Sequence, residues 1–155
     1  MRRATMAEVL SWLVNARSRH DLRQTPIPLK DLEHWRRTPD CVEHEDGKFF
    51  TVVAVDVFAS NREVNTWSQP LVAPVGQGVS AFLTKRIGGV LHILVQARVE
   101  AGTLDVCELA PTVHCLPTNY RDVSTEHRPP FLDYVLTVDR SRIRYEVLQS
   151  EEGGR

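Results

Sequence analysis

The sequence predicts an α+β fold with a mixed or antiparallel sheet and flanking helices. Apolar residues recur at helical spacing only near the N-terminus, which predicts few helices. Later segments are β-branched and aromatic, or alternate apolar with polar residues at the period of a strand. Turn residues separate these segments at short intervals. We therefore expect a single domain in which an N-terminal helix and linker, residues 1–26, precede a β-rich core, residues 27–155.

Composition excludes several classes of protein. The 155 residues carry a net charge of −1, so no nucleic-acid-binding stripe is expected. No apolar run has the length of a membrane span, and the Met-Arg-Arg-Ala start lacks the apolar core of a signal peptide. The three cysteines form no compact framework, which is typical of a reducing compartment: Cys41, Cys107 and Cys115. We expect a cytoplasmic protein without a nucleic-acid or membrane partner.

The first expected element is an amphipathic helix. Thr5 and Glu8 have the spacing of a capping box. The residues of the apolar stripe recur at helical spacing: Met6, Val9, Leu10, Leu13 and Val14. The polar face mixes acidic and basic residues, so a membrane-surface helix is not expected. We expect the stripe to pack against this domain or against a partner subunit.

Residues 27–35 predict a turn into a short helix, because Pro28 stands near its first turn. Its apolar residues should point inward: Leu29, Leu32 and Trp35. Three potential zinc ligands are close by: His34, Cys41 and His44. Their spacing matches no common zinc pattern and no fourth ligand is evident, so we expect no metal.

Residues 49–58 are aromatic and β-branched and predict a strand. A turn at Ser60-Asn61 should lead to a second strand, residues 62–72, ending near Pro70 and Pro74. Alternation puts four residues on one face of that strand: Glu63, Asn65, Trp67 and Gln69. An indole among polar groups is either a surface for stacking a base or sugar, or an edge residue that covers the core.

The stretch Gly76-Gln77-Gly78 superficially fits a dinucleotide-binding fingerprint. That fingerprint requires a strand before it and a helix after it. Here Pro74 precedes it, and Val79, Ala81 and Leu83 alternate as in a strand. We therefore reject a Rossmann fold and expect a hairpin loop.

Residues 88–100 predict a strand with one apolar and one polar face. The apolar face contains Leu91, Ile93, Val95, Ala97 and Val99, and the other face contains His92, Leu94, Gln96, Arg98 and Glu100. The polar face is either solvated surface or the lining of a pocket for a polar, anionic ligand. After a turn at Ala101-Gly102, further strands are expected within residues 105–115, 134–138 and 143–149.

Four uncommon motifs occur in a fixed order. They are Trp-Ser-Gln-Pro at 67–70, Gly-Gly-Val-Leu-His-Ile-Leu-Val-Gln-Ala at 88–97, Pro-Thr-Val with Asn-Tyr between 111 and 120, and Ser-Glu-Glu-Gly-Gly-Arg at 150–155. With these motifs the chain, from about Ile27 to Arg155, resembles the NDP-hexose 2,3-dehydratases of deoxysugar biosynthesis. The resemblance implies a fold similar to the Nudix hydrolases. The Nudix metal-binding signature is absent from this sequence, so metal-dependent pyrophosphate cleavage is not expected.

The resemblance also implies a reaction and a partner. The activity would be a lyase reaction of antibiotic and deoxysugar biosynthesis that removes water across carbons 2 and 3 of a dTDP-4-keto-6-deoxyhexose, without a cofactor. The chain corresponds to the first of two repeats, so it would form a homodimer or pair with the missing second repeat. The alternative is a non-catalytic dTDP-sugar-binding half, or a truncated copy, of such an enzyme. A departure from the family at Val113-His114-Cys115-Leu116-Pro117 keeps that alternative open.

The reaction needs a group that titrates near neutrality to act as acid or base. His92 is the first candidate, and Glu152 and Tyr120 follow. The resemblance implies that the nucleotide lies against Trp67 and the C-terminal glycine loop, where Arg155 would pair with the pyrophosphate. The expected substrate-binding residues are Trp67, Gln69, Asn119, Ser150, Glu151, Glu152, Gly153, Gly154 and Arg155.

Overall fold

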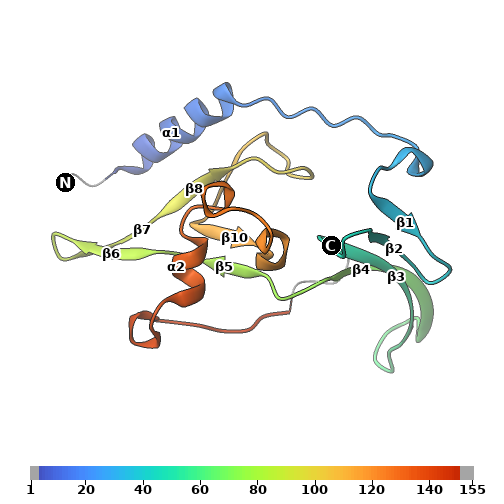
Figure 1. The fold of residues 1–155 in the computed structure, drawn as a ribbon. Coiled ribbons are helices and arrows are strands. Elements are labelled where there is room, and N and C mark those ends of the chain that lie inside the picture. The colour runs from blue at the N-terminus through green and yellow to red at the C-terminus, as the bar shows by residue number, and fades with distance from the viewer. Residues whose placement is uncertain (1–3, 151–155) are drawn as a thin grey trace. The chain divides into compact units, whose positions relative to one another are not determined.

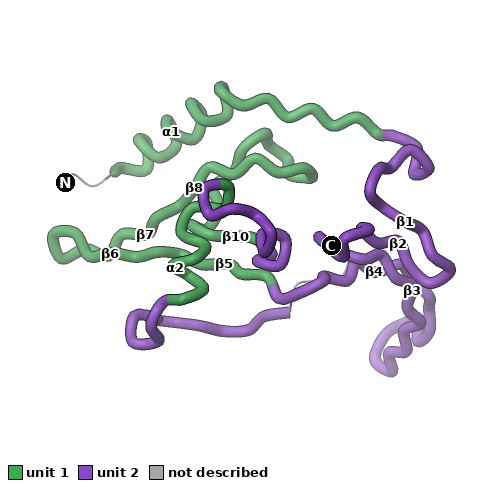
Figure 2. Tube along the Cα trace, viewed as in Figure 1, with its two compact units in different colours: residues 1–26, 78–115, 127–137 green, residues 27–77, 116–126, 138–155 purple. Residues whose placement is uncertain are grey.

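The computed structural model describes residues 4–150, in which antiparallel strands outnumber helices (Figure 1). The chain divides into two compact units (Figure 2). Unit 1 contains residues 1–26, 78–115 and 127–137, and unit 2 contains residues 27–77, 116–126 and 138–155. Every strand pair among the described residues is antiparallel. The predicted α+β class with an antiparallel sheet is therefore confirmed.

Unit 2 contains a four-stranded sheet in the order β1-β2-β3-β4. Its strands are β1, Trp35–Arg37; β2, Cys41–His44; β3, Phe50–Phe58; and β4, Thr66–Pro74. The predicted hairpin of two strands joined near Ser60-Asn61 corresponds to β3 and β4, which pair from Phe50 opposite Pro74 to Phe58 opposite Thr66. Strand β4 continues through both prolines because it lies at the edge of the sheet, where a residue without an N–H breaks no ladder.

The short helix predicted up to Trp35 is wrong. One 3-10 turn forms at Leu29–Asp31, and Trp35 begins β1. His34 adopts the left-handed conformation, with φ of 64°, which ends any helix before the tryptophan. Leu29 is 86% exposed and does not point inward. Further 3-10 turns occur at Pro117–Tyr120, Thr125–His127 and Arg140–Arg142.

Unit 1 begins with helix α1, Met6–Arg19. The predicted capping box is confirmed, because the Thr5 hydroxyl accepts a hydrogen bond from the Glu8 N–H and the Glu8 carboxylate accepts one from the Thr5 N–H. Near its other end Arg17 pairs with Asp105, at 2.6 Å, and donates from Nε to the Cys107 carbonyl, at 2.8 Å. Of the apolar stripe, Leu13 alone is buried. The helix therefore contacts the rest of unit 1 through an ion pair and a hydrogen bond as well as through apolar packing.

The strands of unit 1 form three two-stranded ribbons. They are β5, Val79–Ala81, with β10, Val113–Cys115; β6, Thr84–Ile87, with β7, Val90–Ile93; and β8, Val95–Arg98, with β9, Glu108–Pro111. The strands expected within residues 105–115 are thus confirmed. The hairpin loop expected at residues 76–78 is wrong, because β4 does not pair with β5. The segment is followed by a strand and not by a helix, as predicted.

The single strand expected over residues 88–100 is also wrong, because it divides at Leu94 into β7 and β8. The Leu94 N–H donates to the Leu83 carbonyl, at 2.9 Å, and its carbonyl accepts from the Thr112 hydroxyl. The backbone N–H and carbonyl of Leu94 thus form hydrogen bonds outside the β6–β7 and β8–β9 strand pairs. In β7 the predicted faces are reversed, since Leu91 and Ile93 are 44% and 57% exposed while His92 is half-buried.

Two strands expected near the C-terminus do not form. Residues 134–138 belong largely to helix α2, Leu132–Thr137, and the described residues 143–150 form no helix or strand. Leu132, with 2% exposure, anchors α2, and Arg128 pairs with Asp133 in its first turn at 2.8 Å. A segment of only six residues is too short to separate helical from strand periodicity. Among the described residues, no helix is long and apolar enough to cross a membrane.

The core sits in unit 1. The buried side chains of the described chain all belong to that unit: Leu13, Cys107, Thr112, Val113 and Leu132. Thr112 is the polar member, and its hydroxyl donates to the Leu94 carbonyl and accepts from the Leu83 N–H, at 3.0 Å. One buried hydroxyl therefore connects three junctions, each of which lies between two successive strands.

Candidate functional site

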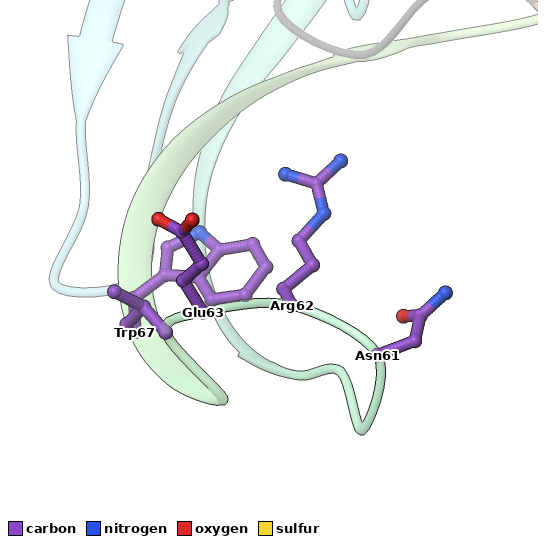
Figure 3. Close-up of a pocket in the computed structure, with 5 residues that line it drawn as sticks. Asn61, Arg62, Glu63 and Trp67 are labelled. Atoms are coloured by element: carbon purple, nitrogen blue, oxygen red, sulfur yellow. The ribbon is translucent and has the colours of Figure 1, made fainter.

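A solvent-open hollow of about 660 Å³ lies in unit 2 beside the turn between β3 and β4 (Figure 3). We call it the Trp67 hollow, and its lining residues are Asn61, Arg62, Glu63, Val64 and Trp67. The turn is closed at its base by a hydrogen bond from the Ala59 N–H to the Asn65 carbonyl, at 2.9 Å. Four of the five lining residues come from this turn, so its conformation decides the shape of the hollow.

Trp67 is held in place by its own strand. It lies opposite Val57 in the register of β3 and β4, and its Nε1 donates to the Gln69 Oε1 at 2.6 Å. The two residues share a face because they are two positions apart in a strand, as predicted. Glu63 and Asn65 precede β4, so their predicted place on the strand face is wrong. Glu63 instead reaches the hollow from the turn.

Arg62 lies over the indole. Its Cζ is 5.8 Å from the centroid of the Trp67 ring, within the range of a cation–π interaction. Figure 3 shows Arg62 and Glu63 leaving the turn in different directions beside the indole. The Trp67 hollow thus combines a flat aromatic surface, a guanidinium and a carboxylate. Such a set can hold a planar ring that carries an anionic group.

Two predicted residues, Asn119 and Tyr120, lie in the Pro117–Tyr120 turn of unit 2. The Asn119 side-chain oxygen accepts a hydrogen bond from the Phe49 N–H, at 3.0 Å. Phe49 has a φ of 65°, a strained value for a residue with a large side chain. Asn119 therefore stabilises the entry into β3, and its role in substrate binding stays a prediction. Tyr120 is half-buried.

His92 belongs to unit 1, on β7 opposite Lys85. Its Nδ1 lies 3.0 Å from the Val90 carbonyl. Because a carbonyl can only accept, this hydrogen bond places a proton on Nδ1 and leaves Nε2 as the nitrogen that can take up another proton. Trp67 belongs to unit 2, so a site shared by the two residues stays a prediction. Ser150 is exposed, and the predicted residues Glu151, Glu152, Gly153, Gly154 and Arg155 lie outside the described residues.

The polar face predicted for residues 88–100 has mainly a structural role. Gln96 donates to the Pro111 carbonyl at 2.9 Å, and Arg98 donates to the His114 carbonyl at 2.6 Å. Arg98 also pairs with Glu100 at 2.9 Å. Burial raises the pKa of the nearby Cys115 thiol, and the positive charge of Arg98 partly opposes this shift. These side chains connect β8 to β9 and β10.

Sequence reasoning missed an aromatic cluster in unit 2, which we call the Trp35 cluster: Trp35, His44, Phe49 and Phe50. The Trp35 and Phe50 rings are 4.7 Å apart, and the His44 and Phe49 rings are 5.0 Å apart. At its margin His34 Nδ1 lies 2.5 Å from a Glu45 oxygen, and the hydrogen bond and charge of Glu45 raise the pKa of His34. Within residues 4–150 no three potential metal ligands come together. The available signal in the sequence was the two-residue spacing of Val42 and His44, which puts both side chains on one face of the short strand β2.

Comparison with known proteins identifies the relatives of the chain. A family model described as NDP-hexose 2,3-dehydratase matches residues 6–155. Three relatives are each named dTDP-4-dehydro-6-deoxy-alpha-D-glucopyranose 2,3-dehydratase. The Amycolatopsis orientalis protein is 57% identical over 96% of this chain and 31% of the relative. The proteins of Saccharopolyspora spinosa and Streptomyces violaceoruber are each 50% identical, over 98% and 96% of this chain and 31% and 34% of the relatives. The chain therefore spans about a third of the length of these relatives.

Proposed function

The chain belongs to the NDP-hexose 2,3-dehydratase family, and on that premise we propose that it acts as part of a lyase that removes water from a dTDP-4-keto-6-deoxyhexose. The observation that carries the proposal is 50–57% identity to proteins named for this reaction over almost the whole chain. The Trp67 hollow supports it with an aromatic surface of the kind that holds a nucleoside.

The proposed reaction is an elimination. The carbonyl at carbon 4 makes the hydrogen on carbon 3 acidic, so a protein base removes that proton and leaves an enolate. The hydroxyl on carbon 2 then departs as water after receiving a proton from an acid. No hydride is transferred overall, so the proposed reaction requires no nicotinamide, and the proposal includes no cofactor.

We assign the base to His92, because its Nε2 is free to accept a proton while Nδ1 donates to the Val90 carbonyl. Tyr120 and Glu152 are the further candidates for the acid or base. The proposed sugar-nucleotide site contains the remaining predicted residues: Trp67, Gln69, Asn119, Ser150, Glu151, Gly153, Gly154 and Arg155. Arg155 would pair with the pyrophosphate.

The proposal extends to the architecture. It includes a single repeat of residues 1–155, with an N-terminal helix and linker before a Nudix-like core, and either a homodimer or an assembly with a second repeat. The exposed apolar residues of α1 support such an assembly, since Met6, Leu10 and Val14 are 72%, 52% and 62% exposed. A cytoplasmic location and a place in antibiotic deoxysugar biosynthesis belong to the same proposal.

A second candidate function is a dTDP-sugar-binding part without turnover. It is favoured by the share of the relatives that the chain spans, 31–34%. Mass spectrometry after incubation with dTDP-4-keto-6-deoxyglucose separates the two. Loss of one water at high protein concentration supports the lyase. An unchanged substrate together with a dTDP-induced rise in Tm supports the binding part, and neither effect would contradict both.

A further inference from the structure

We propose that Arg62 binds the diphosphate of the sugar nucleotide and competes with its base for the exposed face of Trp67. The inference rests on the proposed function for the identity of the ligand and adds a residue that the sequence did not single out. It starts from the position of the guanidinium, 5.8 Å from the centroid of the indole ring in a hollow open to solvent.

The charge of Arg62 is available to a ligand. Arg62 is exposed, and within residues 4–150 its guanidinium makes no ion pair. Its contact with the indole is a weak one, worth about 0.5–1 kcal/mol at an exposed site. A diphosphate offers two parallel acceptors to the planar guanidinium, which is a stronger interaction than the contact with the ring.

The aromatic face of Trp67 is limited in area. The indole Nε1 donates a hydrogen bond to Gln69 and the ring lines the hollow, so a ligand reaches Trp67 from the hollow. A base that stacks on this face displaces the guanidinium from the ring. The released side chain remains within reach of a phosphate attached to the same nucleoside, because both start from one hollow.

Glu63 decides on which side the phosphates lie. Its carboxylate lines the same hollow and repels a diphosphate. Since Arg62 and Glu63 leave the turn in different directions, the phosphates are placed on the Arg62 side (Figure 3). Glu63 remains an acceptor for an N–H of the base or a hydroxyl of a sugar.

The experiment is isothermal titration calorimetry of the full chain with thymidine, dTMP and dTDP. In Arg62→Gln we expect affinity for dTDP to fall about tenfold, the effect of losing one charge-assisted contact, and its salt dependence to weaken. Affinity for thymidine should stay the same or rise, because the competitor for the indole is gone. Arg62→Lys keeps the charge but loses the planar guanidinium, so its affinity for dTDP should lie between those of the wild type and Arg62→Gln. Arg37→Gln, an exposed arginine on β1 of the same sheet, is the matched control and should change nothing.

The outcomes separate this inference from the proposed function. Wild-type binding of dTDP with an unchanged affinity in Arg62→Gln would overturn the role of Arg62 and leave the proposed function intact. An equal loss for thymidine and dTDP would also overturn it, since Arg62 would then only position the indole. Absence of dTDP binding by the wild-type chain would overturn both. A Tm of Arg62→Gln within a degree or so of wild type, on the order of what an exposed loop change causes, verifies folding.

Discussion

Two tryptophans of unit 2 lie on the same sheet, in β1 and β4, and both are half-buried. The two residues are covered by different groups. Trp35 contacts three other rings, His44, Phe49 and Phe50, with centroids 4.7–6.3 Å away. Trp67 is hydrogen-bonded to Gln69 and lies below the Arg62 guanidinium, beside an open hollow that Glu63 also lines. Of these two half-buried tryptophans, one stabilises the fold and the other keeps a face accessible to a ligand.

The comparison predicts its largest effect for Trp35→Ala. Removing the indole leaves the other rings of the Trp35 cluster without their central contact, so unfolding free energy should fall by about 2–3 kcal/mol, somewhat less than for a fully buried tryptophan. Urea denaturation followed by circular dichroism measures the change. Where the variant is still folded, at low temperature, its affinity for dTDP should equal that of the wild type. An unchanged urea midpoint would show that the cluster does not support the sheet.

Trp67→Ala should give the converse result. Loss of one stacking surface removes about 1–3 kcal/mol of binding free energy, so the dTDP concentration needed for a given rise in Tm should increase about 5- to 150-fold. The unliganded Tm should change less than in Trp35→Ala, because Trp67 packs against fewer groups. A thermal-shift titration tests this, with Trp12→Ala on α1 as the control indole. A dTDP dose dependence equal to that of the wild type would remove Trp67 from the site.

Asn119→Ala sharpens the comparison, because Asn119 was expected at the substrate and is found bonded to Phe49. Loss of its hydrogen bond to the strained Phe49 backbone should cost about 1 kcal/mol of stability. If this contact is its whole role, affinity for dTDP should be unchanged when measured by calorimetry well below the Tm. A fall in affinity without a loss of stability would instead favour the substrate-binding role.

The smallest expected effect concerns pH at the margin of the Trp35 cluster. Glu45 raises the pKa of His34 above its usual 6.5, with smaller contributions from Glu33 and Asp46. A histidine whose pKa is raised by folding contributes stability that is fully present below the pKa of the unfolded chain and is lost as pH rises through the folded value. The Tm difference between wild type and Glu45→Gln should therefore shrink as pH increases from 6 toward 8. A difference that grows over this range would contradict the pairing.

The sequence predicted what depends on neighbouring residues. The capping box of α1 and the β3–β4 hairpin follow from spacings of a few positions, and Trp67 stood out because polar residues flank it. In contrast, the division of residues 88–100 depends on Thr112, which lies 18 positions beyond Leu94. The short helix α2 depends on the burial of Leu132. The periodicity of a segment does not predict contacts of this kind, because they are made by segments far apart in the chain.

The candidate site likewise contains features that neighbouring residues predict and features that they do not. The pairing of Trp67 with Gln69 follows from strand alternation, whereas the position of Arg62 depends on the turn at residues 59–65, whose shape no spacing specifies. The catalytic role that we propose for His92 involves residues of both units, since His92 belongs to unit 1 and Trp67 to unit 2. The local hydrogen bond from Nδ1 to the Val90 carbonyl favours Nε2 as the proton acceptor.

The most direct measurement of the central claim is a ¹H–¹⁵N correlation spectrum of the chain during titration with dTDP. The three tryptophans give separate indole N–H signals, which single Trp→Ala variants assign. We expect the signal of Trp67 to shift with dTDP in a saturable manner while those of Trp12 and Trp35 stay in place. A saturable shift of the Trp35 signal with Trp67 unmoved would contradict the account, since the ligand would then occupy the cluster that we assign to the fold.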